Sequence, residues 1–230
     1  MLIYANGCSM TMGAELSEPD KTSYPGLLAR RFGMTLFNDA QGGSSNCRVL
    51  RTSMLWISEY LQQRGRAEDL FVLIGWTAPD RREVALSSQE GAPDQNLFWR
   101  SLLIRHELQG APPDYVQLRK LIIRSFWCDR ESMTRFLVAI NSLQSFLVST
   151  SIRFCFSHAM PVCPLHSELV PLVRSVVSDK FFQFMGERTD FHSYCTNAGL
   201  PTGKLGHPLE EGHERWAVCL ADFITEKHLL

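Results

Sequence analysis

Ser9 and His207 are the side chains whose types and positions best suit nucleophilic chemistry. The apolar run 2–5 and the small residues at 6–8 predict a short buried strand that ends in a tight turn just before Ser9. In open α/β sheets, ligands bind at the carboxyl ends of the strands, so a serine there is a candidate nucleophile. A serine that caps the next helix is the simpler alternative. His207 lies in a loop before the final helix, from which an imidazole can reach Ser9.

Three short motifs, in order along the chain, carry a resemblance to a known family. Residues 7–11 (GCSMT) resemble the Gly-Asp-Ser-Leu-Ser/Thr block of the SGNH (GDSL-type) serine hydrolases. Residues 38–45 (NDAQGGSS) look like the second block, in which an Asn precedes the oxyanion-hole glycine. Residues 207–217 (HPLEEGHERWA) look like the last block, with its catalytic His-Pro. The resemblance therefore spans nearly the whole chain.

The resemblance implies a nucleophile at Ser9, a base at His207, and an oxyanion hole that includes the backbone amides of Ser9 and Gly43. It implies an ester hydrolase that works through an acyl-enzyme on Ser9, such as a deacetylase acting on a small molecule or a carbohydrate, with no cofactor. Two alternatives stay open. One is an acyltransferase or condensing enzyme that uses the same acyl-enzyme, and the other is a non-catalytic binding protein on the same fold.

The third block departs from the family pattern. After the apolar strand 70–74 the family has Gly-x-Asn-Asp, whose Asn donates to the oxyanion, and this chain has Thr77 at the Asn position. Either the Thr77 hydroxyl replaces that donor or the donor is missing. Arg81 or Arg82, just beyond, is a candidate ligand for an anionic group of the substrate, although a surface arginine is the simpler interpretation.

The last block lacks the acid of the family. The resemblance places an Asp three residues before the catalytic histidine, and here that residue is Lys204, which cannot accept an imidazole N–H. Three replacements are open: a backbone carbonyl of the loop 204–206, Asp190, or Glu210. Glu210 also suits a cap of the last helix. We favour a Ser–His dyad that a backbone carbonyl orients.

Other reactive side chains have simpler interpretations. Cys8 replaces the family's Asp beside the nucleophile, and neighbours in an extended segment point opposite ways, so Cys8 is expected in the core. His158, Cys163 and His166 have partly ligand-like spacing, but a structural zinc site takes four ligands. No metal is therefore expected.

The hydrophobic pattern predicts a single α/β domain over residues 1–230. Its fold is flavodoxin-like, with a three-layer α/β/α arrangement around a mostly parallel sheet of about five strands. Residues 84–130 exceed an ordinary connection and predict a helical insertion or lid near the site. The last helix is expected to begin with Pro208. The strands that the pattern places are 2–5, 34–38, 70–74 and 152–156, whereas the fifth strand has no clear candidate.

Composition narrows the partners. With a net charge of −1 and no dense stripe of Lys and Arg, a nucleic-acid partner is not expected. No apolar run is long enough to span a bilayer, and the start of the chain does not look like a secretory signal. The seven scattered cysteines are typical of reduced thiols, so we expect a cytoplasmic protein. The oligomeric state stays open.

Overall fold

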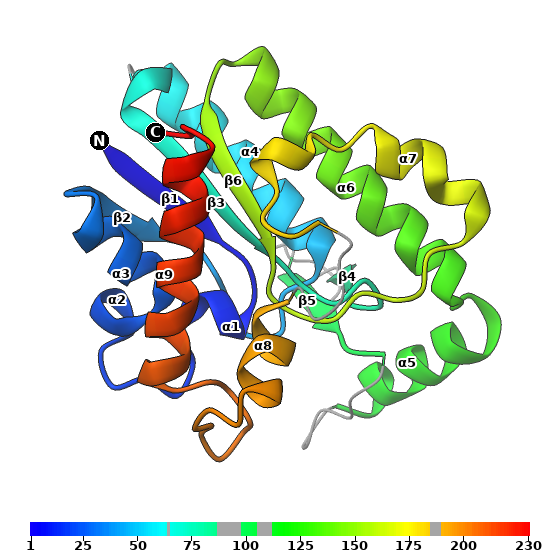
Figure 1. Ribbon diagram of the computed structural model, residues 1–230. Coiled ribbons are helices and arrows are strands. Elements are labelled where there is room, and N and C mark those ends of the chain that lie inside the picture. Colours follow the sequence, from blue (N-terminus) through cyan, green and yellow to red (C-terminus); the bar gives the residue numbers. More distant parts are fainter. Residues whose placement is uncertain (64, 87–97, 105–111, 185–189) are drawn as a thin grey trace.

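The computed structural model describes residues 1–230 apart from 64, 87–97, 105–111 and 185–189 (Figure 1). Its centre is a sheet of four parallel strands in the order β2-β1-β3-β6. The prediction of a parallel α/β fold is confirmed, because these are the four strands that the apolar runs place. Their bounds are β1 Leu2–Asn6, β2 Thr35–Asn38, β3 Leu70–Trp76 and β6 Arg153–His158.

Two isolated β-bridges lie where a fifth strand would pair with β6. Phe156 pairs with Phe181 and His158 pairs with Asp190, in both cases parallel. These bridges extend the sheet past β6 and complete the strand order of a flavodoxin-like sheet. Each bridge pairs only one residue with β6, so the segment does not form a continuous strand and the sequence shows no apolar run of strand length for it.

Helices cover both faces of the sheet (Figure 1). One face carries α3 (Tyr24–Arg31) and α9 (Glu210–Glu226), and the other carries α4 (Asn46–Gln62) and α6 (Asp129–Ser149). Alternate residues of β3 enter the two core clusters, which is why the whole strand is buried and reads as one apolar run. Shorter helices are α1 Ser9–Met12, α2 Pro19–Thr22, α7 Val170–Arg174 and α8 Phe191–Asn197.

The last helix begins later than the sequence predicts. Pro208 is not its first residue, because α9 starts at Glu210. Pro208 forms an isolated antiparallel bridge with Thr202, and the N–H of Leu209 donates to the carbonyl of Pro201 at 3.1 Å. These contacts keep the chain extended through Leu209 and close the loop that carries His207.

The inserted segment holds a small sheet as well as a helix. β4 (Arg82–Leu86) and β5 (Phe98–Leu102) form an antiparallel pair that the sequence does not predict, and α5 (Pro113–Ser125) follows. Leu102, Ile104 and Tyr115 make a separate small core. Figure 1 places this insertion beyond the ends at which β1 and β3 finish.

The insertion is fastened to the body of the protein by an ion pair between α4 and β4. Arg51 Nη2 lies 2.7 Å from Glu83 Oε1, and the Glu83 side chain is only 3% exposed. The insertion is therefore held over the sheet edge. Among the described residues, no helix has the length and apolar character needed to cross a membrane.

Candidate active site

Ser9 lies where the sequence predicts it, two residues past the turn that ends β1. Gly7 occupies that turn because a Cβ there would stand 2.2 Å from Thr11 Oγ1 and 2.7 Å from the Gly75 carbonyl oxygen. Ser9 is the first residue of α1 and is 9% exposed. Cys8 precedes the helix and is fully buried in the core, as predicted. Ser9 is thus not the cap residue of α1.

The loop that carries Gly43 runs beside this turn. The N–H of Gln41 donates to the Gly7 carbonyl at 3.3 Å, which holds the loop after β2 against the turn after β1. Gly43 has a φ of +73°, a left-handed conformation that favours glycine. Within the described part of the chain its N–H donates to no acceptor, and the amide of Ser9, as the first helical residue, has no acceptor within α1.

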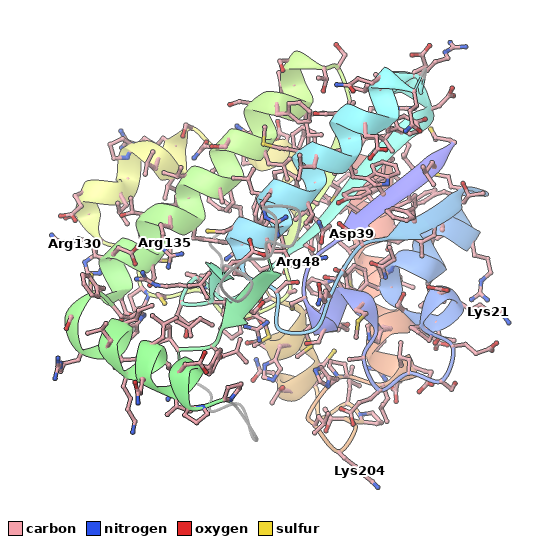
Figure 2. The ribbon with its side chains drawn as sticks, turned by 180° about the vertical axis from the view of Figure 1, so that it is seen from behind. Lys21, Asp39, Arg48, Arg130, Arg135 and Lys204 are labelled. Atoms are coloured by element: carbon pink, nitrogen blue, oxygen red, sulfur yellow. The ribbon has the colours of Figure 1, made fainter. Side chains whose placement is uncertain are left out.

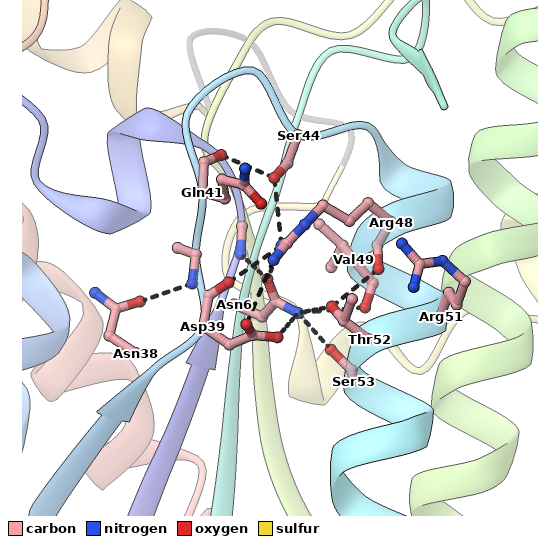
Figure 3. Close-up of polar contacts among 12 residues, drawn as sticks. Asn6, Asn38, Asp39, Gln41, Ser44, Arg48, Val49, Arg51, Thr52 and Ser53 are labelled. Atoms are coloured by element: carbon pink, nitrogen blue, oxygen red, sulfur yellow. Dashed lines mark hydrogen bonds and ion pairs between the residues drawn. The ribbon is translucent and has the colours of Figure 1, made fainter. Parts of the chain in front are cut away.

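A buried amide, Asn6, supports the turn from below (Figure 3). Its Oδ1 accepts from the N–H of Gly7 at 2.8 Å, and its Nδ2 donates to Thr52 Oγ1 at 2.8 Å and to Ser53 Oγ at 3.0 Å. Asn6 is fully buried, so these bonds replace the water that its polar atoms would otherwise need. The network ties the end of β1 to α4.

Asp39 and Arg48 close the same network on the side of β2. Their side chains point toward one another (Figure 3), with Arg48 Nη2 3.4 Å from Asp39 Oδ1. Arg48 also donates to Ser44 Oγ at 3.4 Å, which fixes the loop just beyond Gly43. The backbone around Gly43 is therefore held by side chains of α4.

Thr77 follows β3 at the neighbouring strand end. Its N–H donates to Asn46 Oδ1, and Asn46 Nδ2 donates to the Thr77 carbonyl, each at 2.9 Å. Among the described residues the Thr77 hydroxyl has no hydrogen-bond partner, and the residue is fully buried. Thr77 thus lies at the expected edge, with a free hydroxyl that solvent does not reach.

A carboxylate that lies outside all of the sequence motifs, that of Glu15, contacts His207. Glu15 Oε2 lies 2.9 Å from Nδ1 of His207, and the two side chains are 18% and 16% exposed. The same carboxylate accepts from the N–H of Leu205 at 3.0 Å and from the N–H of His207 at 3.2 Å. These hydrogen bonds, that of Leu205 above all, lower the pKa of Glu15. Glu15 therefore holds both the ring and the loop of His207.

Glu15 follows Ser9 by six residues and has an unusual backbone. Its φ is +70°, although it is not a glycine. A left-handed residue of this kind costs free energy and tends to persist at functional sites. It follows the Gly13 that ends α1, where the N–H groups of Gly13 and Ala14 both donate to the Ser9 carbonyl. The short segment from Ser9 to Glu15 thus carries both the candidate nucleophile and the carboxylate that contacts His207.

The two carboxylates named from the sequence do not contact His207. Asp190 accepts from the N–H of Ser193 at 2.8 Å and caps α8, and Glu210 lies in the first turn of α9 with no hydrogen bond to the imidazole. The expectation that a backbone carbonyl orients the ring is wrong as well, because Nδ1 meets Glu15. Lys204, at the position of the family's acid, points away from the protein (Figure 2).

Ser9 and His207 are not hydrogen-bonded to one another within the described part of the chain. Catalytic hydrogen bonds are often long in unliganded proteins and tighten when substrate binds. The geometry therefore joins His207 to Glu15, and it joins Ser9 to Glu15 only through the backbone.

The other buried histidines pack in the interior. The N–H of Tyr24 donates to Nδ1 of His213 at 3.1 Å, and burial, followed by the nearby His207, lowers the pKa of His213 to about 3. His158 is fully buried against Phe136, Phe181 and Phe184, without a hydrogen-bond partner for either ring nitrogen. Within the described residues, no three potential ligands lie together as a metal site would require.

A cavity of about 510 Å³ opens beside Gly43. Its described lining comes from the loop after β2, from α4 and from the insertion: Gln41, Gly42, Gly43, Arg48, Arg51, Thr52, Glu83, Ser101, Leu103 and Tyr115. The free N–H of the Gly43 loop thus borders a space large enough for a small ligand.

Solved structures share this architecture over nearly the whole chain. TesA matches with a TM-score of 0.53 at 10% identity, with 99% of each chain covered. The psychrotrophic esterase EstA from Pseudoalteromonas sp. matches with a TM-score of 0.51 at 12% identity, covering 98% of this chain and 97% of that one. A two-domain esterase active on acetylated mannans matches with a TM-score of 0.51 at 12% identity, covering 99% of this chain and 49% of that one.

At these identities the likeness establishes the fold, which is that of the SGNH (GDSL-type) hydrolases. Residues 13–230 match a family of unknown function, DUF6071, and the chain belongs to that family. No curated protein sequence matches the chain.

Proposed function

We propose that this protein is a serine ester hydrolase in which Ser9, His207 and Glu15 act together. The observation that carries the proposal is the 2.9 Å contact between the Glu15 carboxylate and the His207 imidazole. Glu15 lies in the short turn that begins at Ser9. A carboxylate on Nδ1 fixes the tautomer that leaves Nε2 free to accept a proton, and it stabilises the imidazolium that forms. Glu15 thereby supplies what Lys204 cannot.

The reaction has two halves. Ser9 Oγ attacks the ester carbonyl while its proton passes to Nε2 of His207, and the alcohol leaves with that proton to give an acyl-enzyme. Water then attacks the acyl-enzyme while its proton passes to His207, and His207 returns that proton to Ser9 Oγ as the bond to the acyl group breaks and the acid leaves. The amides of Ser9 and Gly43 stabilise the oxyanion, and the unpartnered Thr77 hydroxyl is a third donor if the turn after β3 opens.

We infer a small-molecule or carbohydrate acyl ester as the substrate. The esterase active on acetylated mannans shares the fold, and the cavity beside Gly43 suits a small ligand. We also infer a reducing compartment such as the cytoplasm, because the chain has seven cysteines, an odd number, and their scatter is typical of reduced thiols.

Acyl transfer is the second candidate. Ser101, Leu103 and Tyr115 of the insertion line the cavity beside Gly43, so the insertion is placed to hold an acceptor alcohol or amine in place of water. This favours the lid interpretation of residues 84–130. Turnover of one ester in the presence of added alcohols distinguishes the two reactions, since a transferase forms new esters at the expense of free acid.

A fluorophosphonate probe tests the chemistry. We expect labelling at Ser9, located by mass spectrometry, and loss of labelling in Ser9→Ala. Ser17→Ala is the matched control, since Ser17 is an exposed serine of the following loop. Labelling at another residue would contradict Ser9 as the nucleophile, and no labelling of the folded wild type at any pH would support the non-catalytic binding protein.

A further inference from the structure

A second, smaller cavity lies at the carboxyl ends of β3 and β6. Its volume is about 180 Å³. The described lining consists of residues 78–81 after β3, residues 160–163 after β6, and Leu103 and Ile104 of the insertion. Most of these side chains are apolar.

Arg81 is among the residues that line this cavity and brings a positive charge to its wall. Its backbone N–H closes a turn on the Ala78 carbonyl at 3.2 Å, and among the described residues Nη1 of its guanidinium, which solvent does not reach, has no hydrogen-bond partner. Within the described residues Arg81 forms no ion pair. Arg82 differs, because it donates to Glu131 Oε2 at 2.5 Å and to the Phe126 carbonyl at 3.3 Å. A buried donor without an acceptor is costly, so it calls for an explanation.

We propose that Arg81 binds a carboxylate carried by the substrate, which makes this protein selective for esters of short acids that bear a second, free carboxyl group. The proposal rests on the proposed hydrolase function and names its substrate class. A guanidinium pairs well with a carboxylate, and the apolar walls suit a short methylene chain. Asp80 also lines this cavity, and it has an interaction of its own. Because like charges repel, its carboxylate disfavours a phosphate dianion more than a monoanion.

Two residues relate this cavity to the site. Ala78 directly follows Thr77, and Leu103 lines both this cavity and the one that contains Gly43. We therefore expect a short ester whose carbonyl lies near the Gly43 amide to extend past Leu103 toward Arg81. The insertion supplies the wall that the two cavities share.

Paired esters test the selectivity. Monomethyl succinate, with a carboxylate on the acyl side, is compared with methyl pentanoate, which has none. Arg81→Gln should lower kcat/KM for monomethyl succinate by about ten- to hundredfold, while kcat/KM for methyl pentanoate changes less than about threefold. Arg81→Lys should keep part of the selectivity. Arg130→Gln is the control, because Arg130 of α6 (Figure 2) carries the same charge and forms an exposed ion pair with Glu168.

A binding measurement separates this proposal from the hydrolase function. Calorimetry with monomethyl succinate on Ser9→Ala should show binding that Arg81→Gln abolishes and that inorganic phosphate does not displace. If no ester is hydrolysed but binding of monomethyl succinate depends on Arg81, the function fails and the carboxylate site stands. If neutral esters are hydrolysed at Ser9, while Arg81→Gln and Arg81→Lys, both folded by circular dichroism, match wild type on every ester and monomethyl succinate does not bind to Ser9→Ala, the carboxylate site is refuted.

Discussion

The imidazole of His207 and the carboxylate of Glu15 form one hydrogen-bonded pair, with Nδ1 and Oε2 2.9 Å apart across 192 residues of sequence. The same carboxylate also accepts hydrogen bonds from the backbone N–H groups of Leu205 and His207. The loop and the ring of the proposed base are thus set by a single side chain.

The substitution Glu15→Gln should lower kcat for ester hydrolysis by about a hundredfold to ten-thousandfold, because an amide cannot stabilise the imidazolium and can impose the wrong tautomer. The fold should survive, since an amide oxygen still accepts the loop N–H groups. Steady-state hydrolysis of 4-nitrophenyl acetate measures the effect.

Glu18→Gln is the matched control, because Glu18 is an exposed carboxylate of the same segment that pairs with Lys21. Equal activity of the Glu15→Gln and Glu18→Gln variants would show that Glu15 has no part in the reaction.

Glu15 was not predictable from the sequence pattern. The family's acid is found by counting back from the histidine, which leads to Lys204, whereas the carboxylate that contacts His207 is near the start of the chain. One sequence feature does point to Glu15. It is a carboxylate in the turn that follows the candidate nucleophile, two residues after the Gly13 that ends α1. Sequence spacing cannot show such a contact, because the fold alone brings the two segments together.

The strands were predictable where burial makes a continuous apolar run, as in β3, and not where pairing is short. β4 and β5 pair only with one another, and the bridge of His158 with Asp190 is a single pairing, so neither leaves a clear hydrophobic period. Ser9 and Gly43 could be placed from sequence because the strand-end turns are encoded locally by small residues and glycine.

The buried histidines should make the protein less stable in mild acid. Burial lowers the pKa of His158 to about 3 in the folded state, against about 6.5 when unfolded. Between these values the unfolded chain takes up a proton that the folded chain does not, so the free energy of unfolding falls as pH falls below about 6.5. From pH 7 to pH 5 the loss is about 2 kcal/mol for each such histidine.

Urea unfolding at pH 7 and pH 5 measures this dependence. His158→Leu should lose one histidine's share of it and keep the share of His213, whose pKa burial also lowers to about 3. The same pH dependence in the wild type and in His158→Leu would mean that His158 is not buried as a neutral ring.

Two adjacent glycines offer a paired test of the loop. Gly43→Ala should destabilise the protein by about 1 kcal/mol, because its φ of +73° strains any residue with a Cβ, and it should lower kcat by shifting the amide proposed to face the oxyanion. At Gly42 a Cβ would meet nothing within 4 Å and φ is not left-handed, so Gly42→Ala should leave kcat unchanged. Thermal unfolding and kcat are measured for both variants. Equal changes in stability and in kcat for Gly42→Ala and Gly43→Ala would contradict the role proposed for Gly43.

The central claim is that Ser9 and His207 act as one unit, and kcat for Ser9→Ala, His207→Ala, the double variant and Cys8→Ala tests it most directly. Each single alanine should abolish nearly all ester hydrolysis, and the double variant should be scarcely worse, because a nucleophile and its base fail together. Cys8→Ala should retain most activity, with a modest loss of stability from a small buried side chain. If Cys8→Ala abolishes turnover while Ser9→Ala does not, the nucleophile is the thiol and the account is contradicted.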